Sequence, residues 1–395
     1  MNSLNSISPN KTDYAGIYIH LPFCVHKCPY CDFYSATDLS LKQPFIRALM
    51  KEMAMSCDIP FPFDTIYIGG GTPSVFSARH IGQLIETAYS FFKILPDAEI
   101  TIEVNPGTVD LDRLKEYNHA GVNRINIGVQ SFQDKNLNFL GRIHSARDAI
   151  FAVEWAGNAG FDNIGLDLIY GIPNQTKKSW LMDLKKAVEL APEHLSCYTL
   201  TYESGTPMNN DRQKGRFYPL PENLVADLFE LTIESLTDYG YMQYEISNFA
   251  RSDSSKPELN KSRHNRKYWS FAPYIGFGPS SHSFIEPYRY WNCSDVQKYI
   301  RDIDAGRLPI EKKELLNREQ QIIEAIYLGL RQTDGIQIDI FDKKFGVNFK
   351  KIFKKIIMDL EKNGLLRLDQ NLCALSKKGM LFHDAIVEML ICRKI

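Results

Sequence analysis

Three closely spaced cysteines constrain this chain more than any other feature of its sequence. Cys24, Cys28 and Cys31 have the spacing C-x3-C-x2-C and directly follow an apolar, strand-like run at 16–19. Thiolates are soft ligands that favour iron–sulfur clusters, zinc or copper(I). A [4Fe–4S] cluster normally takes four cysteines, so three on one tight loop can hold three irons and leave the fourth open.

An open iron can bind a ligand that offers an amine and a carboxylate together. S-adenosylmethionine offers both, and an electron from the cluster can then cleave its carbon–sulfur bond. The alternative is a structural zinc loop completed by His20 or His26. Zinc sites usually combine two C-x2-C pairs, and this sequence has no second pair, so the pattern favours the iron–sulfur cluster.

Bulk composition limits the class of protein. The chain has 395 residues, 44% hydrophobic content and a formal net charge of −1, which favours a multidomain globular protein without the basic footprint of a nucleic-acid binder. The first residues lack a secretory h-region and no run of about 18 apolar residues predicts a membrane span, although peripheral membrane contact stays open. Five scattered cysteines fit a reducing cytoplasm: Cys57, Cys197, Cys293, Cys373 and Cys392.

Short β-branched runs alternate with longer amphipathic runs from residue 16 onward. We expect six strands, at 17–20, 65–68, 99–104, 124–129, 164–169 and 195–200. Between them we expect five helices, at 40–56, 78–93, 109–119, 145–158 and 177–190. Such βαβ units build a parallel sheet. The pattern predicts an α/β fold, a partial (β/α)6 TIM-like barrel, with a doubly wound sheet as the competitor.

Glycines and polar residues gather where the predicted strands end, which is where either fold places its site. The run Gly69–Ser74 follows the second strand, and its glycines let the backbone approach a ligand and donate N–H groups. Glu103, Gln130 and Arg142 follow later strands, and solvated surface residues are the alternative for Glu103 and Arg142. Asp167 lies inside an apolar strand, where an unpaired charge is costly, so we expect it to face the site.

A second motif lies beyond the predicted barrel. A polar stretch at 201–220 predicts a loop over the barrel mouth, followed by a helix at 222–239 and a strand at 240–250. The sequence HNRKYW then begins at His264. Histidine is the usual axial ligand of haem iron, and the aromatic residues that follow can pack on a porphyrin face. A satisfied histidine in a turn with core aromatic residues is the alternative.

From about residue 308 the composition shifts toward Lys, Glu and Leu. Helices are expected at 318–330, 339–345, 349–363 and 376–390, with a small hairpin at 365–375. This combination predicts a winged-helix-like α+β module. The lysines of the 349–363 helix are interleaved with Asp359 and Glu361, which favours a solvated face over a nucleic-acid surface.

These motifs resemble a known family. The cysteine spacing after a strand resembles radical SAM enzymes, and the longer Y-x-H-x-P-F-C form at 18–24 resembles the oxygen-independent coproporphyrinogen III oxidase (HemN) family. The C-x3-C-x2-C-x-F ending looks like the HemW branch, the radical SAM haem chaperones, because the oxidase branch carries a further cysteine where this chain has Phe33. H-N-x-x-Y-W resembles the haem motif of that branch.

The resemblance implies ligands residue by residue. Cys24, Cys28 and Cys31 would hold the [4Fe–4S] cluster, and His264 would bind the haem iron. Contacts to S-adenosylmethionine would come from Tyr18, Tyr30, Gly70, Gly71, Thr72, Glu103, Gln130, Arg142 and Asp167, with Thr201 beside them. In the oxidase, some of these residues hold a second S-adenosylmethionine.

The resemblance also implies a haem chaperone that delivers haem to acceptor apoproteins. A flavodoxin-like electron donor and a homodimer are further expectations. The alternatives are the oxidase, which decarboxylates two propionates by hydrogen abstraction, and a radical SAM enzyme acting on another tetrapyrrole. The chain would divide into a flexible leader (1–13), a radical SAM partial barrel (14–215), a family-specific extension with the haem motif (216–307) and a C-terminal winged-helix-like domain (308–395).

Overall fold

Six parallel strands in sequential order form the centre of the molecule. The computed structural model describes residues 14–252, 258 and 260–391, so the leader expected at 1–13 lies outside the described residues. The strands are β1 (Ala15–Leu21), β2 (Phe63–Gly70), β3 (Ile94–Val104), β4 (Arg124–Gln130), β5 (Ile164–Tyr170) and β6 (His194–Thr199). Each pairs in parallel with the next along the chain. A doubly wound sheet reverses its strand order and these six do not, which confirms the partial (β/α)6 arrangement.

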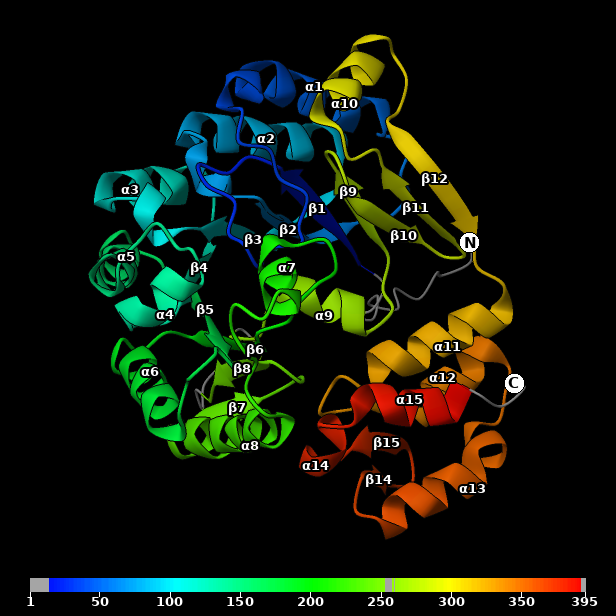
Figure 1. Ribbon diagram of the computed structural model, residues 1–395. Coiled ribbons are helices and arrows are strands. Elements are labelled where there is room, and N and C mark those ends of the chain that lie inside the picture. Colours follow the sequence, from blue (N-terminus) through cyan, green and yellow to red (C-terminus); the bar gives the residue numbers. More distant parts are fainter. Residues whose placement is uncertain (1–13, 253–257, 259, 392–395) are drawn as a thin grey trace, which may run out of the picture.

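Further strands continue the sheet beyond both edges of this parallel set. Beyond β6 lie antiparallel β8 (Asn248–Arg251) and β7 (Tyr241–Gln243). Beyond β1 lies parallel β9 (Tyr274–Phe277), followed by antiparallel β10 (His282–Ile285), β11 (Tyr288–Asn292) and β12 (Ile310–Leu315). The twelve strands run from β12 at one edge to β7 at the other, so the sheet curves without closing (Figure 1).

Helices cover the outer side of this curved sheet (Figure 1). They are α1 (Lys42–Met55), α2 (Ala78–Phe91), α3 (Leu111–His119), α5 (Ala146–Asn158), α6 (Lys177–Glu189), α8 (Glu222–Asp238) and α10 (Val296–Asp304), with short α4 (Asp134–Phe139) between β4 and α5. All five helices expected between the strands are present. Four of them begin where a side chain accepts an N–H of the first turn, at Ser77, Asp110, Ser145 and Thr176.

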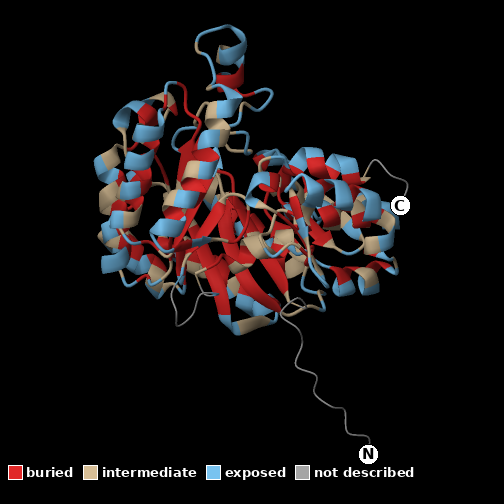
Figure 2. Ribbon diagram, turned by 90° about the horizontal axis from the view of Figure 1, so that it is seen from below, coloured by how far each residue is buried: buried red, intermediate tan, exposed pale blue. Residues whose placement is uncertain are grey.

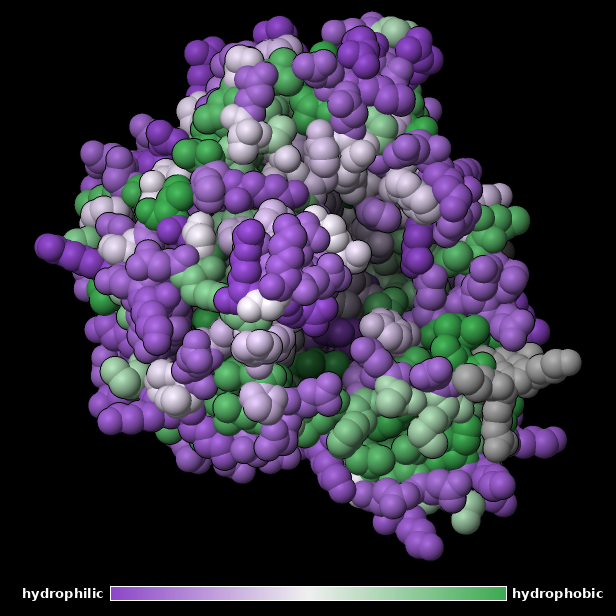
Figure 3. All heavy atoms as spheres, viewed as in Figure 1, coloured by the Kyte–Doolittle hydropathy of each residue, from purple (hydrophilic) through white to green (hydrophobic). Residues whose placement is uncertain are grey.

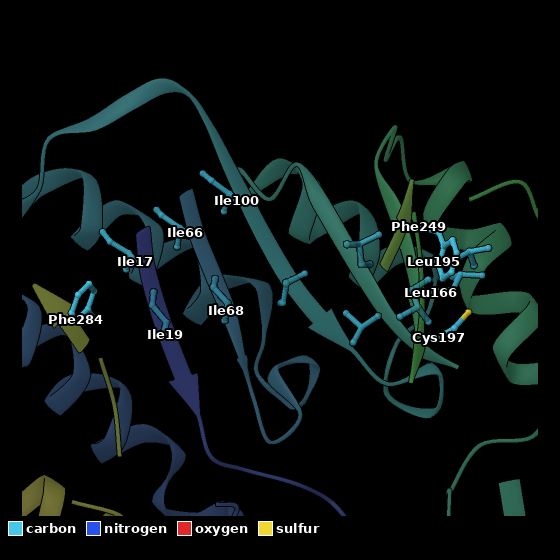
Figure 4. Close-up of a cluster of buried hydrophobic side chains, with 14 of the residues drawn as sticks. Ile17, Ile19, Ile66, Ile68, Ile100, Leu166, Leu195, Cys197, Phe249 and Phe284 are labelled. Carbon is cyan, nitrogen blue, oxygen red and sulfur yellow. The ribbon is translucent and has the colours of Figure 1, made fainter. Parts of the chain in front are cut away.

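Side chains that alternate along each strand divide the sheet into an outer and an inner face. Ile17 pairs in register with Ile66, and both are fully buried in the apolar layer beneath the helices (Figure 4). Tyr18 pairs with Tyr67, and these two rings stack on the inner face. Figure 2 shows buried residues concentrated on the strands of the large sheet, with exposed residues on the outer surfaces of the helices.

Two local predictions differ from the structure. The 201–220 stretch, expected to be a loop, contains α7 (Pro207–Gln213). The 240–250 stretch, expected to be one strand, is split into antiparallel β7 and β8. The carboxylate of Glu245 accepts the N–H of Ser247 at 2.8 Å, and this local bond turns the chain between the two short strands.

A smaller sheet belongs to the C-terminal part, which contains α11 (Arg318–Gly329), β13 (Ile336–Gln337), α12 (Ile338–Phe345), α13 (Phe349–Lys362), β14 (Leu366–Leu368), β15 (Leu372–Leu375), α14 (Lys377–Met380) and α15 (His383–Ile391). Its order is β13-β15-β14, antiparallel throughout, as expected for helices with a hairpin. β12 pairs with β11 in the large sheet, beyond the boundary expected at 308. Within the described part of the chain, every helix is too short or too polar to cross a bilayer.

Candidate functional site

The cysteine loop leaves the carboxyl end of β1 and folds back on itself. The N–H of Cys24 donates to the carbonyl of Ala36 at 3.0 Å, and the N–H of Ala36 donates to the carbonyl of Pro22 at 2.5 Å. A tight turn follows, in which the N–H of Cys31 donates to the carbonyl of Cys28 at 3.1 Å. Cys24 is buried and the other two cysteines are half-buried. All three thiols therefore lie on one short loop at the mouth of the barrel.

Two side chains from later segments reach these thiols. The hydroxyl of Thr72 lies 3.4 Å from the Sγ of Cys24. Arg142 places its Nη1 3.6 Å from the Sγ of Cys28 and 3.5 Å from the hydroxyl of Tyr30. A guanidinium beside sulfur stabilises negative charge there, so Arg142 suits a loop whose cysteines act as thiolates.

The donor set fits an iron–sulfur cluster. Among the residues that the structure describes, no three His, Cys, Asp or Glu side chains converge closely enough to share one metal ion. A [4Fe–4S] cluster takes one thiolate per iron, so its cysteines need not converge on one point. Burial raises the pKa of the Cys31 thiol, and metal binding is what holds such a group as a thiolate.

The glycine run after β2 packs directly against the cysteine loop. A Cβ at Gly71 would lie between 2.8 and 3.0 Å from the backbone of Phe23, a contact that only glycine avoids. The N–H of Gly71 donates to the carbonyl of Leu21 at 2.9 Å, and the N–H of Thr72 donates to that of Phe23 at 2.8 Å. The N–H donors expected for a ligand are thus used within the protein.

Glu103 lies near the end of β3, beside the glycine run. Its Oε1 accepts the hydroxyl of Tyr67 at 2.7 Å, and its Oε2 accepts the N–H of Gly70 at 3.2 Å. Loss of solvation raises the pKa of Glu103 to about 7, although both hydrogen bonds act to lower it. The carboxyl group is therefore partly protonated at neutral pH, and a cationic ligand would favour its charged form.

The next two strands carry an unusual backbone position and a buried carboxyl group. Gln130 ends β4 with φ at 67°, a left-handed conformation that is uncommon outside glycine and often occurs at functional positions. Oδ2 of Asp167 accepts Nδ2 of Asn126 at 2.6 Å, and burial raises the pKa of Asp167. Its Oδ1 is buried, and hydrogen bonding from Ser196, which pairs with Asp167 across β5 and β6, acts to lower the pKa.

Tyr18 and Tyr30, the two tyrosines expected to contact S-adenosylmethionine, lie at different depths in the barrel. Tyr18 is on the inner face of β1, where its hydroxyl lies 3.0 Å from Nδ1 of His20. Tyr30 is in the cysteine loop beside Arg142. At the carboxyl ends of the strands the structure brings together Cys24, Cys28, Cys31, Tyr30, Gly70, Gly71, Thr72, Glu103, Gln130 and Arg142, with Asp167 and Tyr18 deeper in the barrel and Thr201 exposed after β6.

The H-N-x-x-Y-W motif forms α9 (Arg263–Trp269), a short helix beside the amino-terminal parts of β1 and β2 (Figure 1). The carboxylate of Glu99 on β3 accepts the N–H of Arg263 at 3.0 Å and that of His264 at 3.1 Å. These bonds satisfy two of the donors that a helix start leaves free. The motif therefore lies at the opposite end of the strands from the cysteine loop.

His264 is enclosed by its neighbours. The residue is 1% exposed. Its Nδ1 lies 2.8 Å from the hydroxyl of Thr65, and its Nε2 lies 2.9 Å from the hydroxyl of Tyr268. A Cβ at Gly16 would lie 3.0 Å from the ring, so this glycine makes room for it. Burial lowers the pKa of His264 to about 3, which keeps the imidazole neutral, and neither ring nitrogen is accessible to a porphyrin in this state.

Sequence reasoning missed the residues that lie between the two ends of the barrel. Thr65 and Tyr67 alternate with Ile66 and Ile68 along β2, so polar side chains recur with period two in an apolar strand. A polar side chain in an apolar strand is also what identified Asp167 on β5. The same criterion, applied to β2, would have identified Thr65 and Tyr67. Figure 3 shows that the molecular face above this region is hollowed between α7 and the C-terminal helices α11 and α15.

Comparisons with known proteins agree with this geometry. The chain matches the radical SAM superfamily over residues 18–187 and the HemN C-terminal domain over residues 316–382. The solved structure of coproporphyrinogen III oxidase (HemN) from Escherichia coli superposes with a TM-score of 0.82 at 25% identity, covering 97% of this chain and 91% of that one. These findings define a radical SAM protein with a HemN-type C-terminal domain, a class that uses an iron–sulfur cluster and S-adenosylmethionine.

Two relatives that match almost the whole chain identify the family within this class. Heme chaperone HemW of Bacillus subtilis is 36% identical over 375 residues, which covers 93% of this chain and 97% of that protein. Heme chaperone HemW of Lactococcus lactis is 34% identical over 377 residues, with 94% and 96% covered. The chain belongs to the HemW family.

Proposed function

We propose that this protein binds haem and delivers it to acceptor apoproteins, the role that the names of its HemW relatives give to those proteins. The observation that carries the proposal is the H-N-x-x-Y-W motif, which forms a helix of its own with His264 in its first turn. Phe33 adds support, because it is 68% exposed at the end of the cysteine loop, where the oxidase branch carries a cysteine. A neutral histidine is the form that binds iron.

We infer that Cys24, Cys28 and Cys31 hold a [4Fe–4S] cluster. When bound, the cluster supplies an open iron for an amine and a carboxylate, and an electron for cleavage of a carbon–sulfur bond. The residues proposed to contact S-adenosylmethionine are Tyr18, Tyr30, Gly70, Gly71, Thr72, Glu103, Gln130, Arg142 and Asp167. Among them, Glu103 and Asp167 offer acceptors to a cationic ligand, and Arg142 balances charge on the thiolates.

The proposal extends to the protein's location, partners and domain division. A cytoplasmic location keeps the thiols reduced. A flavodoxin-like protein would donate electrons, a homodimer would be the assembled form, and no nucleic acid would be bound. We keep the division into a leader, partial barrel, extension and C-terminal domain, with the last boundary placed after Leu315 because β12 belongs to the large sheet.

The second candidate is the oxidase activity itself, which the likeness of the whole fold to HemN favours. It requires S-adenosylmethionine to be consumed as propionates become vinyl groups. Delivery of haem requires neither the consumption of S-adenosylmethionine nor the formation of vinyl groups. The two candidates are therefore separated by whether coproporphyrinogen III disappears when the reconstituted protein is supplied with S-adenosylmethionine and a reductant.

An anaerobic haem titration of the cluster-reconstituted protein tests the proposal. We expect saturation near one haem per chain, and weaker binding in His264→Ala. His194→Ala is the matched control, because His194 is also 1% exposed and its Nε2 also lies within hydrogen-bond distance of a tyrosine hydroxyl, 2.7 Å from that of Tyr244. Equal loss of binding in both variants would show that His264 acts through folding alone. No saturable binding in the wild type, together with turnover of coproporphyrinogen III, would replace the proposal by the oxidase.

A further inference from the structure

One buried tyrosine touches both candidate sites. The ring of Tyr67 stacks on the imidazole of His264, with centroids 5.1 Å apart and planes inclined by 28°. The hydroxyl of Tyr67 donates to Oε1 of Glu103 at 2.7 Å. Tyr67 is 8% exposed, so both contacts lie in the interior. The side chain therefore lies between the histidine of the haem motif and the carboxylate proposed for S-adenosylmethionine.

The strand that carries Tyr67 joins the two sites at its other residues as well. Thr65, on the same inner face of β2, holds Nδ1 of His264. Gly70, at the end of β2, donates its N–H to Oε2 of Glu103. Because β2 is paired on both sides, with β1 and with β3, it holds these contacts in a fixed relation.

Haem cannot reach His264 while α9 lies in this position. The Nε2 atom is occupied by Tyr268 and the Nδ1 atom by Thr65, and the ring is enclosed. To bind iron, His264 must withdraw from the inner face of the sheet. Withdrawal removes one of the two rings that stack on Tyr67, the other being Tyr18, and leaves a cavity beside it, which a close-packed interior fills by repacking. Movement of the Tyr67 ring into that space would take its hydroxyl out of hydrogen-bond contact with Oε1 of Glu103.

We propose that α9 has a docked and an undocked arrangement, that only the undocked one binds haem, and that Tyr67 makes haem and S-adenosylmethionine antagonists. This inference rests on the proposed function. S-adenosylmethionine at Glu103 fixes the bond from Tyr67 and favours the docked helix, whereas haem at His264 favours the undocked one. Linkage requires that each ligand weaken the other by the same factor. Tyr67 is in this sense a positioning residue for both ligands.

The first test needs no haem. In the cluster-reconstituted protein labelled with ¹⁵N-histidine, the chain's nine histidines report separately, and His264 is assigned by its loss in His264→Ala. We expect S-adenosylmethionine to shift the His264 ring nitrogens in the wild type but not in Tyr67→Phe, which keeps the stacked ring and lacks the hydroxyl. His383, buried in the C-terminal domain, is the internal control and should not shift. Unshifted His264 signals in the wild type would overturn the coupling, whether or not haem binds.

The second test measures the linkage directly. Haem is titrated with and without saturating S-adenosylmethionine, and S-adenosylmethionine with and without haem. We expect each dissociation constant to rise by the same factor, about 5- to 150-fold for sites coupled in this way, and the factor to fall toward one in Tyr67→Phe. A factor of one in the wild type, or an unchanged factor in the variant, would overturn the proposal. Absence of haem binding would instead contradict the proposed function, and the histidine spectra would then decide the coupling alone.

Discussion

Burial sets the protonation states of Glu103 and His264 in the arrangement that the structure shows. Loss of solvation disfavours the charged form of each group, so it raises the pKa of Glu103 to about 7 and lowers that of His264 to about 3. The imidazole of His264 is therefore neutral at any physiological pH while the residue stays enclosed. The carboxyl group is close to its titration midpoint at neutral pH and can gain charge when a cation arrives.

The pH dependence of ligand binding follows from Glu103. Its free-state pKa of about 7 drops when a cationic ligand binds, so binding releases a proton below pH 7 and the affinity for S-adenosylmethionine rises with pH up to about 7. The rise approaches tenfold per pH unit well below the pKa. Glu103→Gln cannot release that proton, so the difference in slope between the two proteins, measured by calorimetry from pH 5.5 to 8, isolates this carboxyl group. Parallel slopes would contradict its role.

Replacing the loop cysteines one at a time tests the cluster ligands. Cys24→Ser, Cys28→Ser and Cys31→Ser should each lose most of the bound iron after anaerobic reconstitution, because a cubane held by three thiolates has no spare protein ligand. Cys57→Ser is the control, since Cys57 is exposed and lies outside the loop. Iron and sulfide analysis with visible absorbance measures the outcome. Binding of one zinc ion per chain by the wild-type protein, in place of iron, would favour the structural zinc loop over the cluster.

At the scale of single elements, α9 is held mainly from outside its own sequence. Glu99 caps its start, Thr65 holds His264, and the Nζ of Lys267 pairs with Asp64 at 2.5 Å. A helix this short has little stability of its own, so its position depends on these contacts. The stability of the docked arrangement is therefore set by the sum of these contacts.

Removal of one hydroxyl tests whether a bond within α9 restrains the imidazole of His264. Tyr268→Phe keeps the aromatic ring and removes the partner of His264 Nε2, a bond of about 1 kcal/mol that must break before this nitrogen can bind iron. Haem affinity should then rise about fivefold, because apparent affinity scales with the fraction of molecules in which the nitrogen is free. A haem titration beside Tyr274→Phe, a neighbouring ring in edge contact with Tyr268, measures the effect. Weaker binding in Tyr268→Phe alone would mean that the hydroxyl contacts haem instead of restraining the histidine.

The same elements show what the sequence could predict and what it could not. The six strands and the intervening helices follow from local periodicity, and the cysteine loop and glycine run follow from spacing within a few residues. The enclosure of His264 does not, because its partner Thr65 is 199 residues away along the chain. The use of the Gly71 and Thr72 N–H groups within the protein also depends on a tertiary contact, with the cysteine loop. Local pattern thus identifies the candidate residues, whereas long-range packing decides their accessibility.

At the scale of the whole molecule, the C-terminal domain holds the far end of α9. The guanidinium of Arg331, just after α11, lies 4.4 Å from the ring centroid of Trp269, and Nε2 of Gln332 donates to the carbonyl of Trp269 at 3.2 Å. Arg331 also pairs at 3.2 Å with Glu245, which is 1% exposed, in the turn between β7 and β8. The last residue of the haem motif is therefore held by the C-terminal domain, whereas the cysteine loop belongs to the barrel, so undocking of α9 involves both parts of the molecule.

Loosening that contact should expose the haem motif. Arg331→Leu removes the cation–π contact with Trp269, worth about 1–2 kcal/mol, so amide exchange over 263–269 should accelerate about 5- to 30-fold and haem uptake should speed up with it. The variant also leaves Glu245 buried without its partner, which destabilises the fold in its own right. The double variant Arg331→Leu/Glu245→Gln removes that charge and separates the two effects, and Arg307→Leu, which breaks an exposed pair with Asp302, is the control. Faster exchange in the C-terminal domain with unchanged exchange over 263–269 would show that α9 stays docked on the barrel alone, and access to His264 would then be governed by Thr65, Tyr67 and Tyr268 without help from the domain.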